Sequence, residues 1–238
     1  MRVVSLVPSL TEAVASTRPE VLVGATDWCT HPEGLDVARV GGSKYPDLDR
    51  VLALRPDLVL LNEEENRRAD ADALVAAGVP VRVTFPRTVP GALDELGDLV
   101  TALGVRAEPE WLVAARRAWA DPPRPAAPRR AMVPVWRRPW VVLGGNTFAG
   151  DVLRRLGVVN AYGDDAERYP RPTLDELRAR DPELVVLPDE PYRFTADDGP
   201  ESFPGVPYAL VSGRHLTWYG PSLADAPALL AAQLAAAR

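Results

Sequence analysis

Apolar residues occur along this chain in two alternating patterns. Short, almost wholly apolar runs are typical of strands buried in a parallel sheet, whereas longer stretches with an apolar residue at every third or fourth position are typical of helices. In the first half, strand patterns cover residues 3–7, 21–26, 58–61 and 79–84, and helix patterns cover residues 47–54, 67–77, 89–103 and 108–120. Strands separated by helices predict parallel pairing with right-handed crossovers.

The pattern restarts after DPPRPAAPRR (residues 121–130), a proline-dense stretch that cannot continue a helix. Beyond it, strand patterns cover residues 131–135, 140–143, 184–187 and 208–211, and helix patterns cover residues 147–156, 174–180 and 223–236. We therefore predict an α/β fold with two lobes, each with a parallel-sheet core, joined by a single inter-lobe helix, with the ligand cleft between the lobes. The expected boundaries are 1–105 for the N-terminal lobe, 106–130 for the inter-lobe helix and linker, and 131–238 for the C-terminal lobe.

One segment of the chain occurs twice at a fixed offset of 126 residues. LDRVLALRPDLVLL (48–61) and LDELRARDPELVVL (174–187) are identical at seven positions. Each copy predicts a short helix, a proline that ends it, and a buried strand. Such a junction is common in α/β proteins, but two copies in the same order on either side of the linker favour two lobes of related architecture.

Two polar patterns predict helix starts. Ser9 and Glu12 have the spacing of a capping box, in which a hydroxyl and a carboxylate satisfy the first free amides of a helix. Asn62 precedes three glutamates, Glu63 to Glu65, and we expect it to cap a helix whose first turn holds them, where the helix dipole favours acids. Binding of a hard cation by the glutamates is the alternative.

Composition narrows the function classes. The 238 residues carry a formal charge of −6, and an acidic surface repels phosphate backbones, so we expect no nucleic-acid partner. No apolar run reaches the ~18 residues that span a bilayer, and the chain does not open with a secretory leader. We therefore expect no membrane insertion and a cytoplasmic location as written, or an extracytoplasmic one if a leader has been removed. A monomer is expected.

Catalytic motifs are absent: the chain has no nucleophile elbow, P-loop, dinucleotide fingerprint or zinc-protease helix. This predicts a protein that is not an enzyme. The alternative is a cytosolic metal- or corrinoid-handling protein or enzyme on the same scaffold, with Cys29, His31 and His215 as metal ligands. Their wide spacing disfavours a dedicated metal site.

The loops that leave the predicted strands are rich in aromatic residues. Ligands of open parallel sheets bind beyond the carboxyl ends of the strands, and flat apolar rings suit a large, partly aromatic ligand. Trp28 and Tyr169 stand among polar residues and prolines, which favours a ligand cleft, whereas Trp136 and Trp140 fit a lobe core equally well. The other loop aromatics are Phe85, Tyr192, Trp218 and Tyr219.

The order of RVVSLVPSLTEAV, VGATDWCTHPE, VGGSKYPDLDRVLALRPDLVLL, LVAAGVPV and RPTLDELRARDPELVVL resembles the vitamin B12-binding and ferric-chelate-binding proteins of ABC importers. These are class III substrate-binding proteins, or helical-backbone metal receptors, with two α/β lobes joined by a rigid helix. The resemblance covers nearly the whole chain, and the helix–proline–strand repeat occurs once per lobe in that family too. It implies a protein that holds cobalamin, a related corrinoid or another metal chelate as ligand, with no intrinsic cofactor.

The resemblance also implies roles for single residues. Trp28 falls where the B12 binders place a cleft aromatic, and Tyr169 falls where they place a second-lobe tryptophan. Where those proteins carry another cleft tryptophan, this chain reads GGSKYP, which puts Lys44 and Tyr45 in that space. Further residues expected to cover the ligand, or to offer helix-start amides to its polar groups, are Trp140, Trp218, Tyr219, Ser9 and Thr147.

Asp49 and Asp175, equivalent positions of the repeat, fall on glutamates that in the importers pair with arginines of the membrane permease. The resemblance thus implies an ABC permease as partner, docked through one acid per lobe. Aspartates in a first helical turn are also favoured locally by the helix dipole, and both explanations stay open. Two features depart from the family. The segment HLTWYGP lacks the aspartate that the B12 binders carry before an aromatic pair near the final strand. The helix at 108–120 spans only ~20 Å at ~1.5 Å per residue, which is shorter than the family's inter-lobe helix.

Overall fold

The computed structural model describes all 238 residues, and the chain divides into two compact units. Unit 1 comprises Met1–Pro86, Ala92–Val113 and Tyr219–Pro221, and unit 2 comprises Arg87–Gly91, Ala114–Trp218 and Ser222–Arg238. Each unit therefore takes short segments from elsewhere in the chain, whereas the boundaries expected from sequence are continuous. None of the helices combines the length and the apolar character that crossing a membrane requires.

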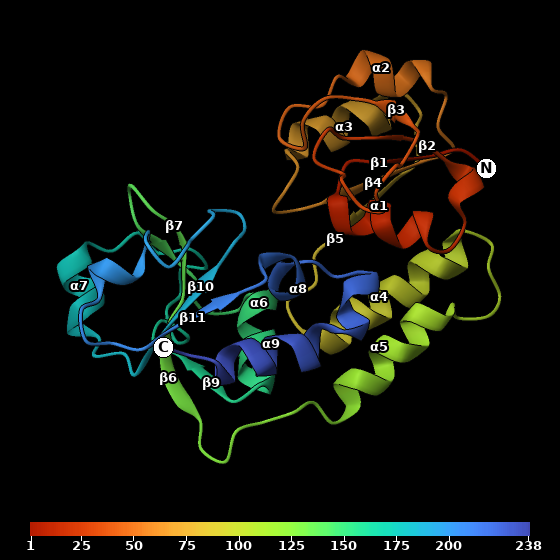
Figure 1. The fold of residues 1–238 in the computed structure, drawn as a ribbon. Helices are drawn as coiled ribbons and strands as arrows, with labels where there is room; N and C mark the ends of the chain where they lie inside the picture. The colour runs from red at the N-terminus through yellow and green to blue at the C-terminus, as the bar shows by residue number, and fades with distance from the viewer. The chain divides into compact units, whose positions relative to one another are not determined.

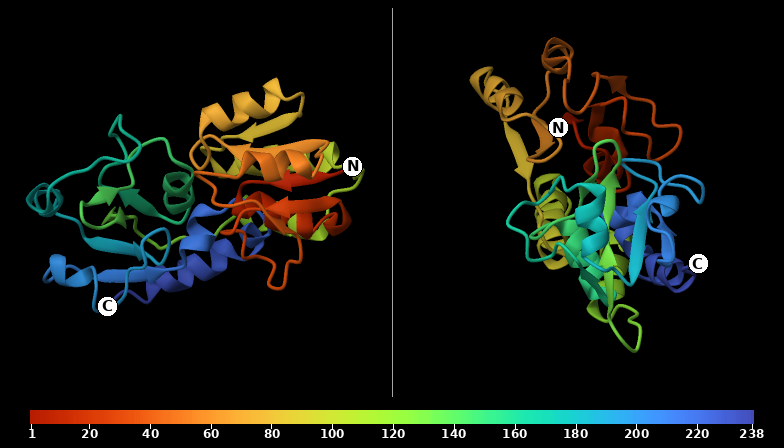
Figure 2. Two further views of the ribbon diagram at one scale, coloured as in Figure 1. Left: turned by 90° about the horizontal axis from the view of Figure 1, so that it is seen from above. Right: turned by 90° about the vertical axis from the view of Figure 1, so that its left-hand side faces the viewer.

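Unit 1 is built on a parallel sheet with the strand order β3-β2-β1-β4-β5. Helices α2 and α3 cover one face and α1 the other (Figures 1 and 2). The strands are β1 Val3–Ser5, β2 Leu22–Ala25, β3 Ala38–Arg39, β4 Leu58–Asn62 and β5 Val81–Thr84. The helices are α1 Pro8–Ala15, η1 Pro19–Val21, α2 Leu48–Ala53, α3 Arg68–Ala76, α4 Val89–Ala102 and α5 Glu110–Ala120, the last two with residues in both units.

Unit 2 has a parallel sheet with the order β11-β10-β6-β9 and a separate antiparallel pair, β7-β8. Helix α7 covers one face of the sheet, and α6, α8 and α9 the other (Figure 1). The strands are β6 Arg129–Met132, β7 Pro134–Trp136, β8 Val141–Val142, β9 Val158–Asn160, β10 Leu184–Pro188 and β11 Tyr208–Val211. The helices are α6 Phe148–Arg155, α7 Leu174–Ala179, η2 Pro200–Ser202, α8 Gly213–Thr217, η3 Pro221–Ala224 and α9 Ala226–Ala235.

The two units share one topology, because β2-β1-β4-β5 corresponds to β9-β6-β10-β11. The sequence repeat lies at the same place in both. Asp47 and Thr173 are the side-chain N-caps of α2 and α7, and Arg55 and Asp181 both have φ +47° just before the repeat's proline. Helices α2 and α7 and strands β4 and β10 keep the offset residue for residue. The predicted α/β fold with two parallel-sheet cores is confirmed.

The acid that follows the repeat's proline has a structural role in both copies. The Asp57 carboxylate accepts a hydrogen bond of 2.7 Å from the Arg2 amide, and the Glu183 carboxylate accepts one of 2.8 Å from the Arg130 amide. Each of these arginines also donates its Nε to the carbonyl at the end of the short helix, Leu54 in one copy and Arg180 in the other. The repeat therefore ties a helix end to the start of the neighbouring strand.

The predicted capping box at Ser9 and Glu12 is wrong. Helix α1 begins at Pro8 with Val7 as N-cap and no side-chain cap, and both polar residues are buried inside the helix. Proline suits this first position because its missing N–H is one that would lack a helical partner. A capping box does form at α7, where Thr173 and Glu176 bond each other's amides.

The helix predicted to start at Asn62 is also wrong. Asn62 Oδ1 accepts hydrogen bonds from the amides of Glu64 and Glu65, but these residues form a turn and α3 begins only at Arg68. The sequence patterns missed β3, β9 and α8, and they merged β6 with β7. Elements of two to five residues are too short to show a period.

Candidate ligand-binding site

In unit 1 all strands are parallel, so the loops after them gather at one edge of the sheet. Hydrogen bonds tie these loops together. Asn66 Nδ2 donates to the carbonyls of Leu6 at 3.2 Å and Ser43 at 2.9 Å, and Lys44 Nζ donates to the carbonyl of Glu64 at 2.8 Å. The loops after β1, β3 and β4 are thereby held in one arrangement.

Two large aromatic side chains stand exposed at this edge, Trp28 on the loop after β2 and Tyr45 on the loop after β3. Trp28 is 68% exposed and Tyr45 is 72% exposed. The indole lies against Gly42, where an added Cβ would be 3.5 Å from Trp28 Nε1, and the Arg67 guanidinium lies 4.7 Å from the centre of the Tyr45 ring. These rings leave flat apolar surface open to a ligand, which is unusual for residues of this size.

Cys29 lies next to this surface but is fully buried. The Thr11 hydroxyl donates to its sulfur at 3.0 Å, Thr26 Oγ1 lies 3.1 Å away, and burial raises the pKa of the thiol. Metal ligation requires the thiolate, which this environment disfavours. His31 Nδ1 contacts Thr30 Oγ1 at 3.1 Å, and no group of three or more His, Cys, Asp or Glu side chains is placed to hold a metal ion.

Behind the aromatic surface lies a buried polar group that the sequence patterns did not indicate. Asn62 Nδ2 donates to the Tyr219 hydroxyl at 2.7 Å, and Thr84 Oγ1 lies 2.9 Å from the same oxygen. Tyr219 is only 5% exposed, and its burial raises the pKa of its phenol. Its ring was expected to cover a ligand, but here its hydroxyl ties the ends of β4 and β5 to the segment at 219–221.

Glu65 is a carboxyl group at this edge whose pKa the structure raises strongly. It is half-buried in the turn after β4. Burial, and then the neighbouring Glu64 carboxylate, raise its pKa to about 7, with Lys44 opposing the rise. Three consecutive glutamates were the only signal for it in the sequence.

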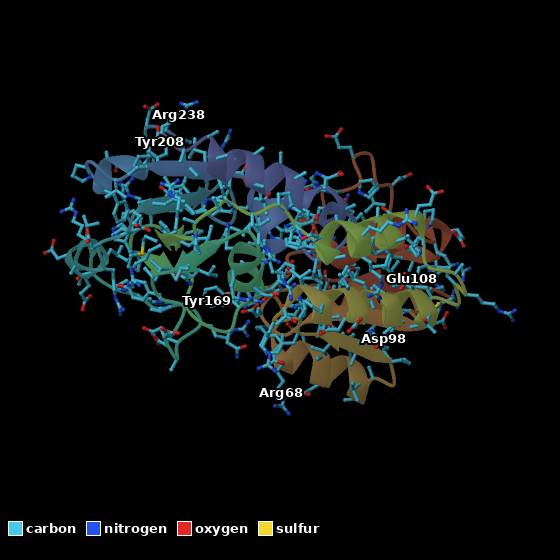
Figure 3. The ribbon with its side chains drawn as sticks, turned by 90° about the horizontal axis from the view of Figure 1, so that it is seen from below. Arg68, Asp98, Glu108, Tyr169, Tyr208 and Arg238 are labelled. Carbon is cyan, nitrogen blue, oxygen red and sulfur yellow. The ribbon has the colours of Figure 1, made fainter.

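Unit 2 also exposes aromatic side chains at or beyond the ends of its strands. Trp136, at the end of β7, is 44% exposed and makes an edge-to-face contact with Tyr192 at 5.6 Å. Tyr169 is 41% exposed (Figure 3). Backbone bonds on either side hold Tyr169: the amide of Gly144 donates to Arg168, and that of Val142 donates to Pro170.

Trp140 and Trp218 are less exposed than Trp136. Trp140 is stacked on Phe194 at 6.3 Å and meets Phe203 edge-on at 5.7 Å within the core of unit 2. The sequence left open whether Trp136 and Trp140 lie in a lobe core or in a cleft. In the structure, Trp140 packs against the core of unit 2 and Trp136 is exposed. Trp218 is half-buried, with the Arg214 guanidinium 5.6 Å from its ring centre.

Arg137 organises the segment that carries Tyr192. It pairs with both Asp198 and Glu201, and the Tyr192 hydroxyl donates to Asp198 at 2.5 Å. This hydrogen bond, with the arginine charge, lowers the pKa of Asp198. The Arg137 guanidinium also lies 5.3 Å from the centre of the Trp140 ring.

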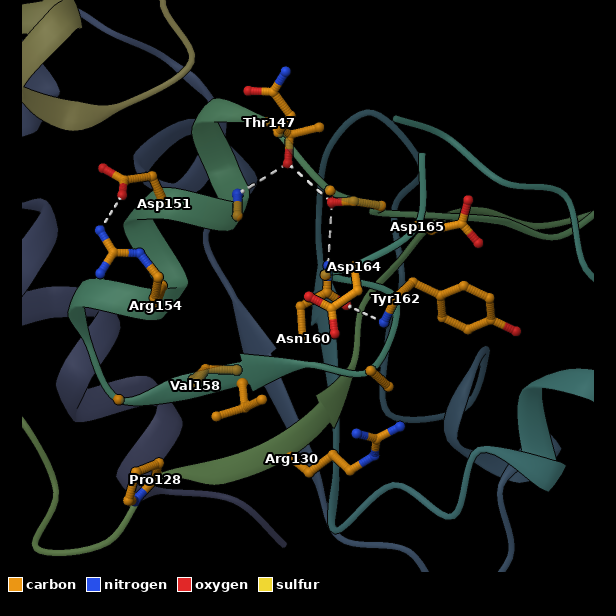
Figure 4. Close-up of a pocket in the computed structure, with 18 of the residues that line it drawn as sticks. Pro128, Arg130, Thr147, Asp151, Arg154, Val158, Asn160, Tyr162, Asp164 and Asp165 are labelled. Carbon is orange, nitrogen blue, oxygen red and sulfur yellow. Dashed lines mark hydrogen bonds and ion pairs between the residues drawn. The ribbon is translucent and has the colours of Figure 1, made fainter. Parts of the chain in front are cut away.

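The loop before α6 lies against the loop that carries Tyr169. A Cβ on Gly144 would lie 2.0 Å from the Glu167 carbonyl oxygen, so only glycine fits there. Thr147 is buried and caps α6 by accepting from the amide of Gly150, and it lines an 870 Å³ pocket within unit 2 (Figure 4). Ser9 is buried on α1, and its hydroxyl has no hydrogen-bond partner.

Asp49 and Asp175 occupy equivalent exposed positions in the first turns of α2 and α7. The N-caps of these helices are Asp47 and Thr173, so the repeated aspartates are not the capping groups. The ligand-binding and docking roles assigned from sequence remain predictions.

The periplasmic binding protein family matches residues 3–201 of the chain. The chain belongs to this family. It is 25% identical over 195 residues to the vitamin B12-binding protein of Yersinia pestis (strain Pestoides F), covering 78% of this chain and 69% of that one. Its fold is similar to that of the periplasmic vitamin B12 binding protein BtuF of Vibrio cholerae (TM-score 0.74, 18% identity, 98% and 96% of the chains) and a periplasmic heme binding protein from Pseudomonas aeruginosa (TM-score 0.72, 26% identity, 100% and 94%).

These findings settle several expectations. The resemblance to class III binding proteins is confirmed, and the relatives are solute-binding proteins that take B12 or heme as ligand, not enzymes. Periplasmic binding proteins hold small molecules and deliver them to ABC permeases. The predicted cytoplasmic location is wrong, because the family and its solved relatives are periplasmic.

Proposed function

We propose that this chain binds a large planar metal chelate, with cobalamin or a related corrinoid as the preferred ligand, for import. One observation carries the proposal: each unit by itself exposes aromatic rings at or beyond the ends of its strands, Trp28 and Tyr45 in unit 1 and Trp136 and Tyr169 in unit 2. Such rings bury large apolar area at low conformational cost. The named vitamin B12-binding relatives support the same ligand class.

The charges of unit 1 favour a corrinoid over a porphyrin. Cobalamin carries amide groups around its ring, whereas haem carries two carboxylates that need cations. The Arg67 guanidinium is already paired with buried Asp70 through bonds of 2.9 and 2.6 Å, and Lys44 bonds the Glu64 carbonyl. The Glu64 and Glu65 carboxyl groups beside them oppose a dianionic ligand.

Titration with cyanocobalamin, followed by calorimetry and by the corrin absorbance, tests the proposal. We expect saturable binding that weakens by about tenfold or more, or ~1.4 kcal/mol, in Trp28→Ala and in Tyr45→Ala, since each removes one ring face. Val75→Ala, which shortens a 57% exposed side chain on α3, serves as control. Absence of saturable binding, or equal affinity in Trp28→Ala and the control, would contradict the proposal.

Haem is the second candidate, because the Tyr45 oxygen is exposed and a phenolate is a known ligand of ferric haem. The same titration with ferric haem separates the two. If haem is the ligand, Tyr45→Phe retains the ring but changes the iron absorbance. If cobalamin is the ligand, Tyr45→Phe binds it nearly as well as the native protein does.

We further propose that Asp49 and Asp175 present one acid from each unit to an ABC permease. Support comes from their equivalent, exposed positions in the two copies of the repeat and from the presence of separate N-caps. The double substitution to lysine is expected to abolish stimulation of the importer's ATPase in proteoliposomes while ligand binding persists. Asp98→Lys, which alters a 76% exposed aspartate on α4, is the control and should behave as native. Equal stimulation by the double variant would refute docking through these acids.

A further inference from the structure

The loop that carries Trp28 covers residues 26–37, between strands β2 and β3, and contains no helix or strand. Irregular loops of this length are uncommon and usually functional. The Trp28 side chain is 68% exposed, so packing against the rest of unit 1 gives its ring little support. A backbone bond of 3.1 Å, from the Cys29 amide to the Thr26 carbonyl, closes a turn beneath the ring. The orientation of the indole therefore depends on what holds this turn.

Arg39, on the two-residue strand β3, donates to three carbonyls of the loop. Its Nη1 donates to the Thr26 carbonyl and to the Cys29 carbonyl, each at 2.9 Å, and these residues stand on either side of Trp28. Its Nη2 donates to the Leu35 carbonyl at 3.2 Å. One guanidinium thus joins the turn that carries the ring to the far end of the same loop.

The Arg39 side chain serves this contact alone. It is half-buried, it takes part in none of the ion pairs of the chain, and all of its hydrogen bonds go to backbone carbonyls of the loop. A guanidinium presents its N–H groups as a rigid planar fork, which suits several carbonyls in fixed directions, whereas the ammonium of lysine is a compact point charge. The geometry of the loop thus explains why arginine occupies this position.

The neighbours of Trp28 are fixed through their side chains as well. Thr26 and Cys29 are both fully buried, and the Thr26 hydroxyl lies 3.1 Å from the Cys29 sulfur. Their side chains are held in the interior of unit 1, and their carbonyls are held by Arg39. Trp28 is the exposed part of a turn whose two ends are fixed.

We infer that Arg39 is a positioning residue of the ligand site: it holds the loop after β2 in one conformation and thereby presents the Trp28 ring to the ligand. The inference rests on the proposed function, in which Trp28 covers the ligand, and Arg39 acts through that ring. Binding is stronger when the interacting groups are ordered in advance, because the cost of ordering them is not added to the binding step. Release of the loop should therefore weaken binding although the ring is still present.

A cycle of single and double substitutions, titrated with cyanocobalamin, separates positioning from a general effect. Arg39→Lys keeps the charge but cannot donate to all of the carbonyls, and we expect it to weaken binding about tenfold or more. In the Trp28→Ala background the same substitution should change the affinity less than about twofold, because the positioned ring is gone. In the Tyr45→Ala background it should again cost about tenfold, because Tyr45 lies on another loop. Arg18→Lys is the matched control, a half-buried arginine of unit 1 that donates to the Leu103 carbonyl at 2.6 Å, and it should bind as native.

Amide hydrogen exchange of the ligand-free proteins tests the hold of Arg39 on the loop without any ligand. The hydrogen-bonded amides of Asp27, Cys29 and Thr30 should exchange at least about tenfold faster in Arg39→Lys than in the native protein, while the strands of unit 1 keep their protection. Thermal unfolding checks that the variant is folded. Arg39→Gln replaces it if it is not, and should give the same pattern.

Equal exchange of these amides in native and variant would overturn the inference. An equal loss of affinity in the Trp28→Ala background would also overturn it, since Arg39 would then act on binding by a route other than the ring. Failure of the native protein to bind cyanocobalamin contradicts the proposed function instead. Faster exchange in Arg39→Lys would in that case still support the hold of Arg39 on the Trp28 loop.

Discussion

Replacing Glu65 by glutamine tests the electrostatics of the unit 1 edge. Burial and the Glu64 carboxylate raise the pKa of Glu65 from 4.5 to about 7 in the folded chain. Between these two values the folded state holds a proton that the unfolded state has lost. Stability conferred by this group is therefore greatest below pH 4.5 and falls as the pH rises to 7, because the carboxyl group ionises in the unfolded chain over this range while burial keeps it protonated in the folded chain.

The size of the effect follows from the same shift. A difference of about 2.5 pKa units at ~1.36 kcal/mol each makes the ionised carboxylate cost about 3 kcal/mol of folding free energy above pH 7. Glutamine has a similar shape and does not ionise. The free energy of unfolding of Glu65→Gln relative to native should therefore increase by about 3 kcal/mol between pH 4 and pH 8.

Urea unfolding followed by tryptophan fluorescence at four or five pH values measures this difference. Only the difference between variants is used, so that the contributions of titrating groups remote from Glu65 cancel. Glu63→Gln, which removes an exposed carboxylate from the same turn, is the control. Parallel stability curves for native and Glu65→Gln would show that Glu65 is not perturbed as described.

Three further substitutions test local packing and ion pairs. Gly144→Ala places a Cβ 2.0 Å from the Glu167 carbonyl, so we expect a loss of about 2 kcal/mol in thermal unfolding, and an unchanged Tm would contradict the close approach. Burial alone would raise the pKa of Asp151. The hydrogen bonds that its carboxylate accepts, of which the bond from Arg155 has the largest effect, outweigh burial, so that the pKa is lowered. Asp151→Asn should therefore cost about 2 kcal/mol at pH 7 and progressively less below pH ~3.8, as the native carboxylate is protonated; a pH-independent cost would argue against the ion pair. Arg137→Ala removes the cation that Asp198 and Glu201 share and should lower the free energy of unfolding by about 2 kcal/mol, which urea unfolding at pH 7 measures.

The sequence by itself determined the elements that depend on local chemistry. Apolar runs predicted β4 and β10, because a strand buried on both faces must be apolar, and the prolines at 56 and 182 marked where the short helices end. The repeat predicted the matched halves, because the same local interactions recur at the same offset. The family resemblance rested on these segments, and it was confirmed with the fold.

Only the tertiary structure decided the features that join distant residues. Asn62 was expected to cap a helix, but its amide bonds the hydroxyl of Tyr219, far along the chain, and burial outweighs the local preference. The shifted pKa of Glu65 and the core position of Trp140 depend on neighbours from other elements. The contact of Arg39 with the Trp28 loop depends on strand β3, whose two residues carry no period. Local sequence thus set the elements, and burial and pairing set their chemistry.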